Sequence, residues 1–140
     1  MKGGDTLKIN LRVKFYDTDL MGVVHHSNYI RWFETARVEF LRAVGIDLNE
    51  MINDGILFPI VEVQAKYLHS AKFDDELELE ITPAVMTKAK WEFEYKIRRA
   101  GEEKILVEGF SRNVFTNAAT GKIMRLPEKY FSMLTNIDAL

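Results

Sequence analysis

Carboxylates and imidazoles crowd into one short segment of this chain, Tyr16–Tyr29, which reads YDTDLMGVVHHSNY. It contains Asp17, Asp19, His25 and His26. A carboxylate just ahead of a helix start can act as a nucleophile or general base. The backbone N–H groups of the helix start can hold a developing negative charge. The segment therefore holds the parts needed for attack on a carbonyl group.

Asp19 is the first candidate for that attack, and it lies three residues before Gly22 and seven before His26. We expect a carbonyl oxygen to face the N–H of His26 and the start of a helix predicted over Asn28–Val44. Asp19 would then attack the carbonyl carbon or deprotonate a water. The alternative is that Asp17 and Asp19 only shape and cap the turn, as aspartates often do.

The two adjacent histidines leave three alternatives open. One imidazole orients the carboxylate or relays a proton, both are structural, or both bind a metal together with the aspartates. Side chains of adjacent residues point in different directions, and His25 and His26 lack the HxH or HxxxH spacing of a shared ligand face. The sequence therefore predicts no metal site.

Three further charged residues are candidates. Glu34 lies beside the apolar stripe of the predicted helix, where it either faces a pocket as a base or pairs with Arg31 or Arg37. Lys88 and Lys90 lie in a turn between two predicted strands. They either hold phosphates as point charges or belong to an ordinary solvated turn.

Hydrophobic periodicity predicts the elements that position these groups. Apolar residues that alternate with polar ones indicate strands, and a period of 3.6 indicates a helix. Ser27 or Asn28 is expected to cap the long helix, and Gly45 to end it. The predicted strands are Leu7–Phe15, Ile56–Tyr67, Glu76–Ile81, Trp91–Ile97 and Lys104–Phe115, and the helices are Asn28–Val44, a short turn at Leu48–Asn53 and a terminal helix over Pro127–Leu134.

One long helix cannot cover both faces of a five-stranded sheet. We therefore predict an α+β fold in a single domain over residues 1–140, with a curved antiparallel five-stranded sheet wrapped around one long helix. Pro59 indicates an edge position or an irregularity, and Gly109 a bulge or a close approach. One sheet face and one edge would remain uncovered, so self-association is expected.

Composition narrows the class of protein. The 19 basic and 21 acidic residues give a net charge of -2, which argues against a nucleic-acid partner. The chain has no cysteine, which excludes disulfides, thiolate zinc sites and a cysteine nucleophile. It has neither an apolar signal region at its start nor a stretch long enough to span a membrane. We expect a cytoplasmic protein.

The motif resembles that of the hotdog-fold acyl-CoA thioesterases of the 4-hydroxybenzoyl-CoA thioesterase family. Within the family, it is most similar to the branch that includes the thioesterase associated with the Tol–Pal cluster. A second segment, Tyr67–Asp75, also resembles the family, as does Arg125–Pro127. The family pattern Asp-x-Asp, x-x-Gly-x-Val, x-His-x-x-Tyr is matched by Asp17, Asp19, Gly22, Val24, His26 and Tyr29.

The resemblance implies a hotdog fold and hydrolysis of a thioester, with coenzyme A or acyl carrier protein as the leaving group and no other cofactor. It implies homodimers or homotetramers with active sites at subunit interfaces. Asp19 matches the catalytic carboxylate, and the backbone N–H of His26 matches the group that polarises the carbonyl. The His26 side chain matches the histidine of the Tol–Pal-type branch. Lys88 and Lys90 fall where basic residues meet the coenzyme A phosphates.

The remaining assignments concern the acyl group. Tyr29 and Phe58 are expected to line the acyl pocket, and Asp17 is expected to be structural. Members that act on benzoyl-CoA carry aromatic residues where this chain has His25 and His26, so short or medium acyl chains are expected as much as aromatic ones. Two alternative functions stay open: an enoyl-thioester hydratase of the same fold, and a non-catalytic protein that binds acyl thioesters.

Overall fold

The computed structural model describes residues 6–134 of the chain. Strands dominate it, and one long helix separates the first strand from the others. In chain order, the elements are β1 (Leu7–Arg12), η1 (Phe15–Asp17), α1 (His26–Ala43), α2 (Leu48–Asn53), β2 (Ile56–Leu57), β3 (Ile60–Tyr67), β4 (Glu76–Met86), β5 (Lys90–Arg99), β6 (Ile105–Asn117), β7 (Ile123–Met124) and α3 (Glu128–Phe131).

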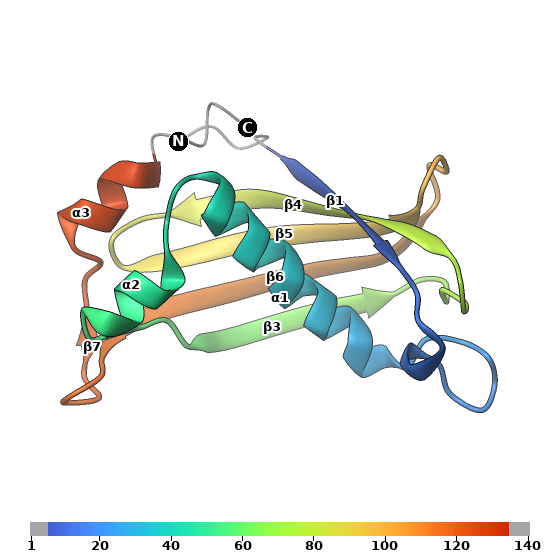
Figure 1. Cartoon of the computed structure of the whole chain (residues 1–140), viewed down its shortest axis with the longest axis horizontal. Helices are drawn as coiled ribbons and strands as arrows, with labels where there is room; N and C mark the ends of the chain where they lie inside the picture. Colours follow the sequence, from blue (N-terminus) through green and yellow to red (C-terminus); the bar gives the residue numbers. More distant parts are fainter. Residues whose placement is uncertain (1–5, 135–140) are drawn as a thin grey trace.

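The strands form one antiparallel sheet, and α1 crosses one of its faces (Figure 1). The order is β1-β4-β5-β6, with both β3 and the two-residue β2 beside β6. β7 adds two more paired residues near the end of β6. The predicted helix within an antiparallel sheet is confirmed. No helix among the described residues has the length and apolar character needed to cross a bilayer.

The helix α1 presents a stripe of buried side chains to the sheet. Phe33 stacks on Tyr95 of β5 with ring centroids 4.4 Å apart. Phe40 meets Phe93 edge-on at 5.3 Å. Each such ring stabilises the fold by about 1.5–3 kcal/mol through burial. The apolar members of the stripe are Tyr29, Trp32, Phe33, Ala36, Phe40 and Leu41.

The start of α1 differs from the prediction. The helix begins at His26 rather than Asn28, and its cap is His25 rather than Ser27 or Asn28. The ring Nδ1 of His25 accepts a hydrogen bond from the N–H of Ser27 at 3.1 Å. An imidazole therefore caps this helix, where a hydroxyl, amide or carboxylate oxygen is usual. Nothing in the apolar period signals this, and the predicted start was wrong by two residues.

The predicted strand over Ile56–Tyr67 divides at Pro59, because proline cannot donate to a sheet ladder. Its longer part, β3, pairs with β6 on one side. On its other side, no strand of the described region pairs with it. Apolar side chains on β3, among them Val61 and Val63, are exposed at this free edge. The terminal helix is also shorter than predicted, since α3 covers Glu128–Phe131.

Gly109 in β6 marks a close approach of the sheet to α1. A Cβ atom built on this glycine would lie 2.2 Å from the ring of Phe33. Gly109 pairs in register with Ala65 and with Tyr95, so the alternative of a bulge at this position is wrong. The missing side chain lets the Phe33 ring rest directly on the backbone of the sheet.

We expect Gly109→Ala to lower the free energy of unfolding by about 1–3 kcal/mol, because the added methyl group overlaps the Phe33 ring. Urea unfolding followed by circular dichroism measures this change. In a Phe33→Leu background the overlapping ring atoms are gone, so the same substitution should cost less. An equal cost in both backgrounds would contradict the close contact as the cause.

Candidate active site

The connection from β1 to α1 folds into a tight loop beyond the N-terminal end of the helix (Figure 1). An isolated antiparallel bridge between Thr18 and Val24 closes the loop. Inside it, the N–H of Asp19 donates to Val23 O at 2.9 Å. Gly22 has a φ of 76°, a backbone conformation that side chains disfavour. The glycine of the motif therefore serves the turn that presents Asp19.

The carboxylate of Asp19 is exposed, and one of its two oxygens stabilises the turn. Its Oδ1 accepts the N–H of Met21 at 2.8 Å. Neither an ion pair nor another hydrogen bond among the described residues uses the side chain. One carboxylate oxygen therefore has the turn-shaping role that was the alternative for Asp19. The second oxygen stays open to solvent or a substrate.

Asp17 sits only two residues away but in a different environment. It is buried, and its Oδ2 accepts the N–H of Lys14 at 2.8 Å. Its backbone carbonyl accepts from the N–H of His25 at 3.0 Å and from Nδ2 of Asn28 at 2.8 Å. These bonds attach the start of the loop to the first turn of α1. The surroundings of Asp17 fit the structural role expected for it.

The start of α1 carries the predicted N–H donor. Ser27 and Asn28 both donate their N–H groups to His25, one to the ring and one to the carbonyl oxygen. The N–H of His26 enters no hydrogen bond that the structure shows among the described residues. It lies at the positive end of an 18-residue helix. A partly negative oxygen placed there would be stabilised by both the donor and the dipole.

The two imidazoles point to different tasks. The His25 ring is occupied as the helix cap and also contacts Ser27 Oγ at 2.8 Å. The His26 ring instead stacks on Tyr67 with centroids 3.9 Å apart and planes 9° from parallel. Residues 6–134 contain no group of three or more histidine, aspartate or glutamate side chains that could hold a metal ion.

The second segment of the motif, after β3, lies beside the first. Val24 donates its N–H to Ala71 O, and Ala71 donates its own N–H to Tyr29 Oη, both at 2.9 Å. Burial raises the pKa of Tyr29, although the bond from Ala71 opposes the shift. Tyr29, predicted to line the acyl pocket, is only 1% exposed in the single chain and ties these segments together.

Tyr67 is the residue that analysis of the sequence missed at this site. Besides stacking on His26, its Oη lies 3.4 Å from His26 O, and its ring lies 5.5 Å from that of Tyr29. The available signal was the resemblance of the Tyr67–Asp75 segment to the family. A strand period alone does not reveal that the end of β3 meets the start of α1.

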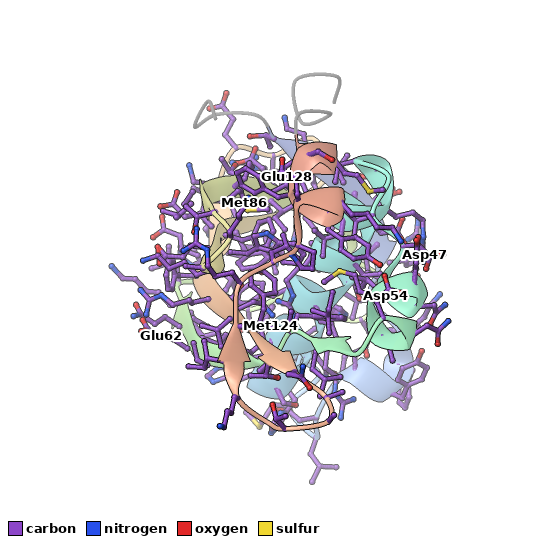
Figure 2. All side chains as sticks on the ribbon, turned by 90° about the vertical axis from the view of Figure 1, so that its left-hand side faces the viewer. Asp47, Asp54, Glu62, Met86, Met124 and Glu128 are labelled. Atoms are coloured by element: carbon purple, nitrogen blue, oxygen red, sulfur yellow. The ribbon has the colours of Figure 1, made fainter. Side chains whose placement is uncertain are left out.

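The predicted phosphate-binding lysines lie at the opposite end of the sheet from Asp19. β4 starts beside Val13 and runs 11 residues to the turn that holds them, a length of about 36 Å. Figure 2 views that end directly, with Met86 and Glu128 toward the viewer. Within one chain, the structure does not bring Lys88 and Lys90 together with Asp19.

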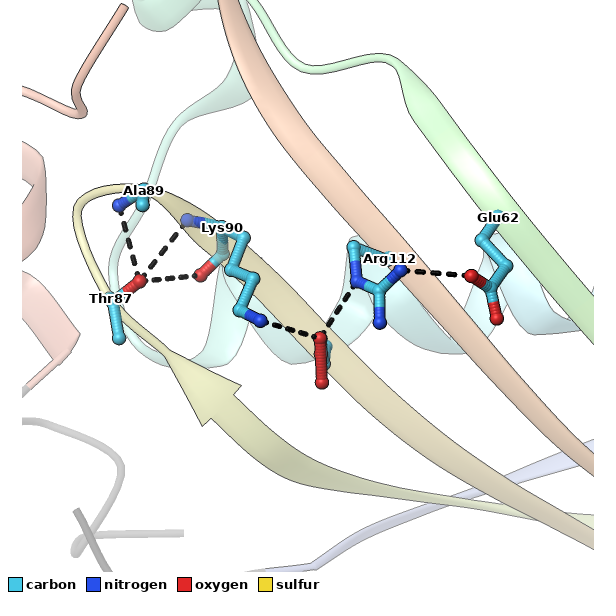
Figure 3. A network of polar contacts seen from close by, with 6 residues as sticks. Glu62, Thr87, Ala89, Lys90 and Arg112 are labelled. Carbon is cyan, nitrogen blue, oxygen red and sulfur yellow. Dashed lines mark hydrogen bonds and ion pairs between the residues drawn. The ribbon is translucent and has the colours of Figure 1, made fainter.

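Both lysines are paired with carboxylates. Lys88 Nζ lies 2.5 Å from Glu128, and Lys90 Nζ lies 3.2 Å from Glu92. Arg112 also binds Glu92 at 2.8 Å (Figure 3). The hydrogen bond from Arg112, and then that from Lys90, holds the pKa of Glu92 below its usual range. To bind a phosphate, each lysine would have to exchange its carboxylate partner.

Two of the hollows along α1 in the described part of the chain also touch the sheet. One, of about 290 Å³, lies between α1 and β3 and is lined in part by Ile30, Glu34 and Val63. The other, of about 150 Å³, is deeper and includes Phe58, the second residue predicted for the acyl pocket. Glu34 lines both hollows and is itself exposed.

Comparison with known proteins identifies the family. The model of the thioesterase-like superfamily matches residues 13–134. The chain belongs to this superfamily. The chain is similar to the acyl-CoA thioesterase YbgC of Haemophilus influenzae, with 34% identity over 90 residues, which are 64% of this chain and 66% of that protein. The 1,4-dihydroxy-2-naphthoyl-CoA hydrolase of Nostoc punctiforme is 29% identical over 126 residues, or 89% and 84% of the two chains.

A solved structure agrees with the fold. The DHNA-CoA thioesterase of Staphylococcus aureus superposes with a TM-score of 0.88, covering 96% of this chain and 92% of that one. At 21% identity, this likeness shows the fold alone. The thioesterase-like chain therefore has the predicted α+β hotdog fold, and it is a thioester hydrolase.

The stacked pair at the helix start gives a test of positioning. We expect Tyr67→Ala to lower kcat for thioester hydrolysis about tenfold, because the His26 ring loses the surface that orients it. Tyr67→Phe keeps the ring and should stay within about twofold of the parent. Steady-state thiol release measures both. Full activity in Tyr67→Ala would show that the stack does not serve the reaction.

Proposed function

We propose that the chain hydrolyses acyl-CoA thioesters to a carboxylic acid and free coenzyme A, with Asp19 as nucleophile or general base. The observation that carries this proposal is the loop between β1 and α1. A single short turn presents an open carboxylate oxygen on Asp19 and ends at the N–H of His26, which has no partner among the described residues. The relatives named above, which act on acyl-CoA and aryl-CoA thioesters, support the same substrate class.

Two routes use these groups. In the first, an Asp19 oxygen attacks the carbonyl carbon, the C–S bond breaks, and the leaving thiolate takes up a proton. Water then hydrolyses the mixed anhydride. In the second, Asp19 takes a proton from a water whose oxygen attacks the carbonyl, and that proton reaches the departing sulfur. In both, the N–H of His26 and the start of α1 stabilise the oxyanion.

A second copy of the chain supplies the rest of the site in this proposal. The free edge of β3 exposes unpaired backbone groups and apolar side chains, which favour pairing with another strand. Antiparallel pairing of β3 with the same strand of a second copy obeys two-fold symmetry. It places opposite ends of the two sheets side by side. The Lys88 and Lys90 of one copy then approach the Asp19 loop of the other.

Asp19→Asn should reduce thiol release from acyl-CoA substrates about a hundredfold or more, because neither route works without the carboxylate. Asp17→Asn is the matched control, since an amide oxygen can still accept the N–H of Lys14. It should retain kcat within a few-fold. A panel of acyl-CoAs assayed with free-thiol detection makes both measurements.

The same panel separates the alternatives. Normal turnover in Asp19→Asn would overturn the proposed role of Asp19. An enoyl-CoA converted to a hydroxyacyl-CoA without thiol release would identify a hydratase. Binding of acyl-CoA without turnover would identify a binding protein. Turnover of acyl carrier protein thioesters alone would show that the leaving group is acyl carrier protein and not coenzyme A.

Complementation tests the shared site. We mix Asp19→Asn with a Lys88→Ala/Lys90→Ala variant under conditions that allow subunit exchange. If the lysines act on the other copy's Asp19, random exchange at equal amounts restores about a quarter of the sites. Activity at low substrate concentration should rise above that of either variant alone. A double variant of Lys8 and Lys96, with the same loss of charge, is the control.

The outcome depends on which chain supplies the lysines. If they serve the Asp19 of their own chain, no heterodimer contains an intact site and mixing restores nothing. A monomeric mass in light scattering would also overturn the shared site. The control pair should leave KM for acyl-CoA unchanged, since Lys8 lies on β1 and Lys96 on β5, away from the turn.

A further inference from the structure

The deeper of the two hollows along α1 has an unusual lining. It lies between the C-terminal half of α1, α2 and the sheet, and it measures about 150 Å³. Leu41, Leu48 and Phe58 give it apolar walls. An apolar cavity of roughly this size can hold a six-membered carbon ring. The hollow therefore has room for the end of an acyl group.

Four polar side chains interrupt these walls. Glu34 and Arg37 come from α1, and Trp91 of β5 and Asn113 of β6 are direct cross-strand partners. Trp91 is fully buried and Asn113 is 1% exposed. Asn113 donates through Nδ2 to Phe58 O at 2.6 Å. Its Oδ1 and the Nε1–H of Trp91 have no hydrogen-bond partner among the described residues. One buried donor and one buried acceptor are thus left on neighbouring positions.

Such atoms are costly to a folded protein. A buried donor or acceptor without a partner typically costs about 1–3 kcal/mol. Most buried polar groups in native proteins do have a partner, so each exception asks for an explanation. Three buried side-chain atoms of the described residues are such exceptions, and one of them, Arg98 Nε, lies away from the cavity. The other two belong to Trp91 and Asn113, which both line it, and this points to a ligand group that satisfies both atoms together.

We propose that this cavity receives the far end of the acyl group and selects acyl groups that carry a hydroxyl there. The hydroxyl oxygen accepts from Trp91 Nε1, and its hydrogen is donated to Asn113 Oδ1. A hydroxyl is the small neutral group that can do both at once. This inference rests on the proposed acyl-CoA hydrolysis and names its substrate class.

In this proposal, the acyl group reaches the cavity from the free edge of the sheet. The shallower hollow between α1 and β3 shares Glu34, Arg37 and Ile60 with the deeper one. An acyl group that enters beside β3 can therefore continue under α1 without crossing the packed core. A methyl group at the same depth would leave both polar atoms without a hydrogen bond. The site therefore disfavours acyl groups that lack the hydroxyl.

The test compares matched pairs of acyl-CoAs. Each pair sets an ω-hydroxyacyl-CoA against the plain acyl-CoA that is one carbon longer, so that a hydroxyl is compared with a methyl group. The chains run from dodecanoyl to hexadecanoyl, because the cavity lies roughly 12–20 Å along α1 from His26. For the best pair, kcat/KM should favour the hydroxylated compound by about tenfold or more. Ordered water is the competing occupant of the cavity, and it predicts a ratio near one in every pair.

Variants assign the preference to the two side chains. Trp91→Phe removes the N–H donor without breaking any bond within the described chain, and it should reduce the ratio at least about fivefold. Asn113→Leu should do the same. Trp32→Phe is the matched control, because Trp32 is buried against Tyr29 and does not line the cavity. It should leave the ratio unchanged.

The outcomes separate this inference from the proposed function. Thiol release that Asp19→Asn abolishes, but with equal rates within each pair, keeps the function and overturns the inference. So does a preference that survives Trp91→Phe and Asn113→Leu. Isothermal titration of the unmodified protein with the free acids needs neither turnover nor a folded variant. Roughly tenfold tighter binding of the hydroxylated acid supports the inference, and equal binding overturns it.

Discussion

The buried hydrogen bond from Ala71 N–H to Tyr29 Oη is the interaction on which the geometry of the site depends. It joins residues 42 positions apart in the chain. With the bond from Val24 to Ala71, it ties the end of the loop that carries Asp19 and the first turn of α1 to the segment after β3. Burial raises the pKa of the Tyr29 hydroxyl, and it also strengthens the bond, because a low local dielectric favours hydrogen bonds. These bonds therefore attach the loop between β1 and α1 firmly to the packed core.

Burial also separates the two aspartates of the motif, although they are two residues apart. Asp17 turns inward, where backbone N–H groups and the Asn28 side chain use its oxygens. Asp19 turns outward, and its own hydrogen bonds, to Met21, Gly22 and Val23, all lie within the loop. A rigid anchor beside an accessible carboxylate is what a positioned nucleophile needs, since freedom left in the loop would be lost again in the transition state.

The sequence predicted what depends on local pattern. Alternating residues located the long strands, the apolar stripe located α1, and Gly109 indicated the contact that Phe33 makes. It did not predict the helix start, because a histidine cap is chemically rare. The stack of Tyr67 on His26 arises where the end of β3 meets the start of α1, and the pairing of Trp91 with Asn113 arises from strand register. Register joins residues far apart in the chain, and no period within one segment encodes it.

The contact between Phe33 and Gly109 sets how closely α1 approaches the sheet. The helix rests on the sheet backbone at this point, in its N-terminal half, while the cavity with Trp91 lies under its C-terminal half. A bulkier residue at position 109, or a smaller one at position 33, would change the distance between α1 and the sheet. The size of the cavity under the C-terminal half of α1 would change with it. In the acyl site proposed above, substitutions that touch no residue of the cavity would therefore change which acyl groups fit.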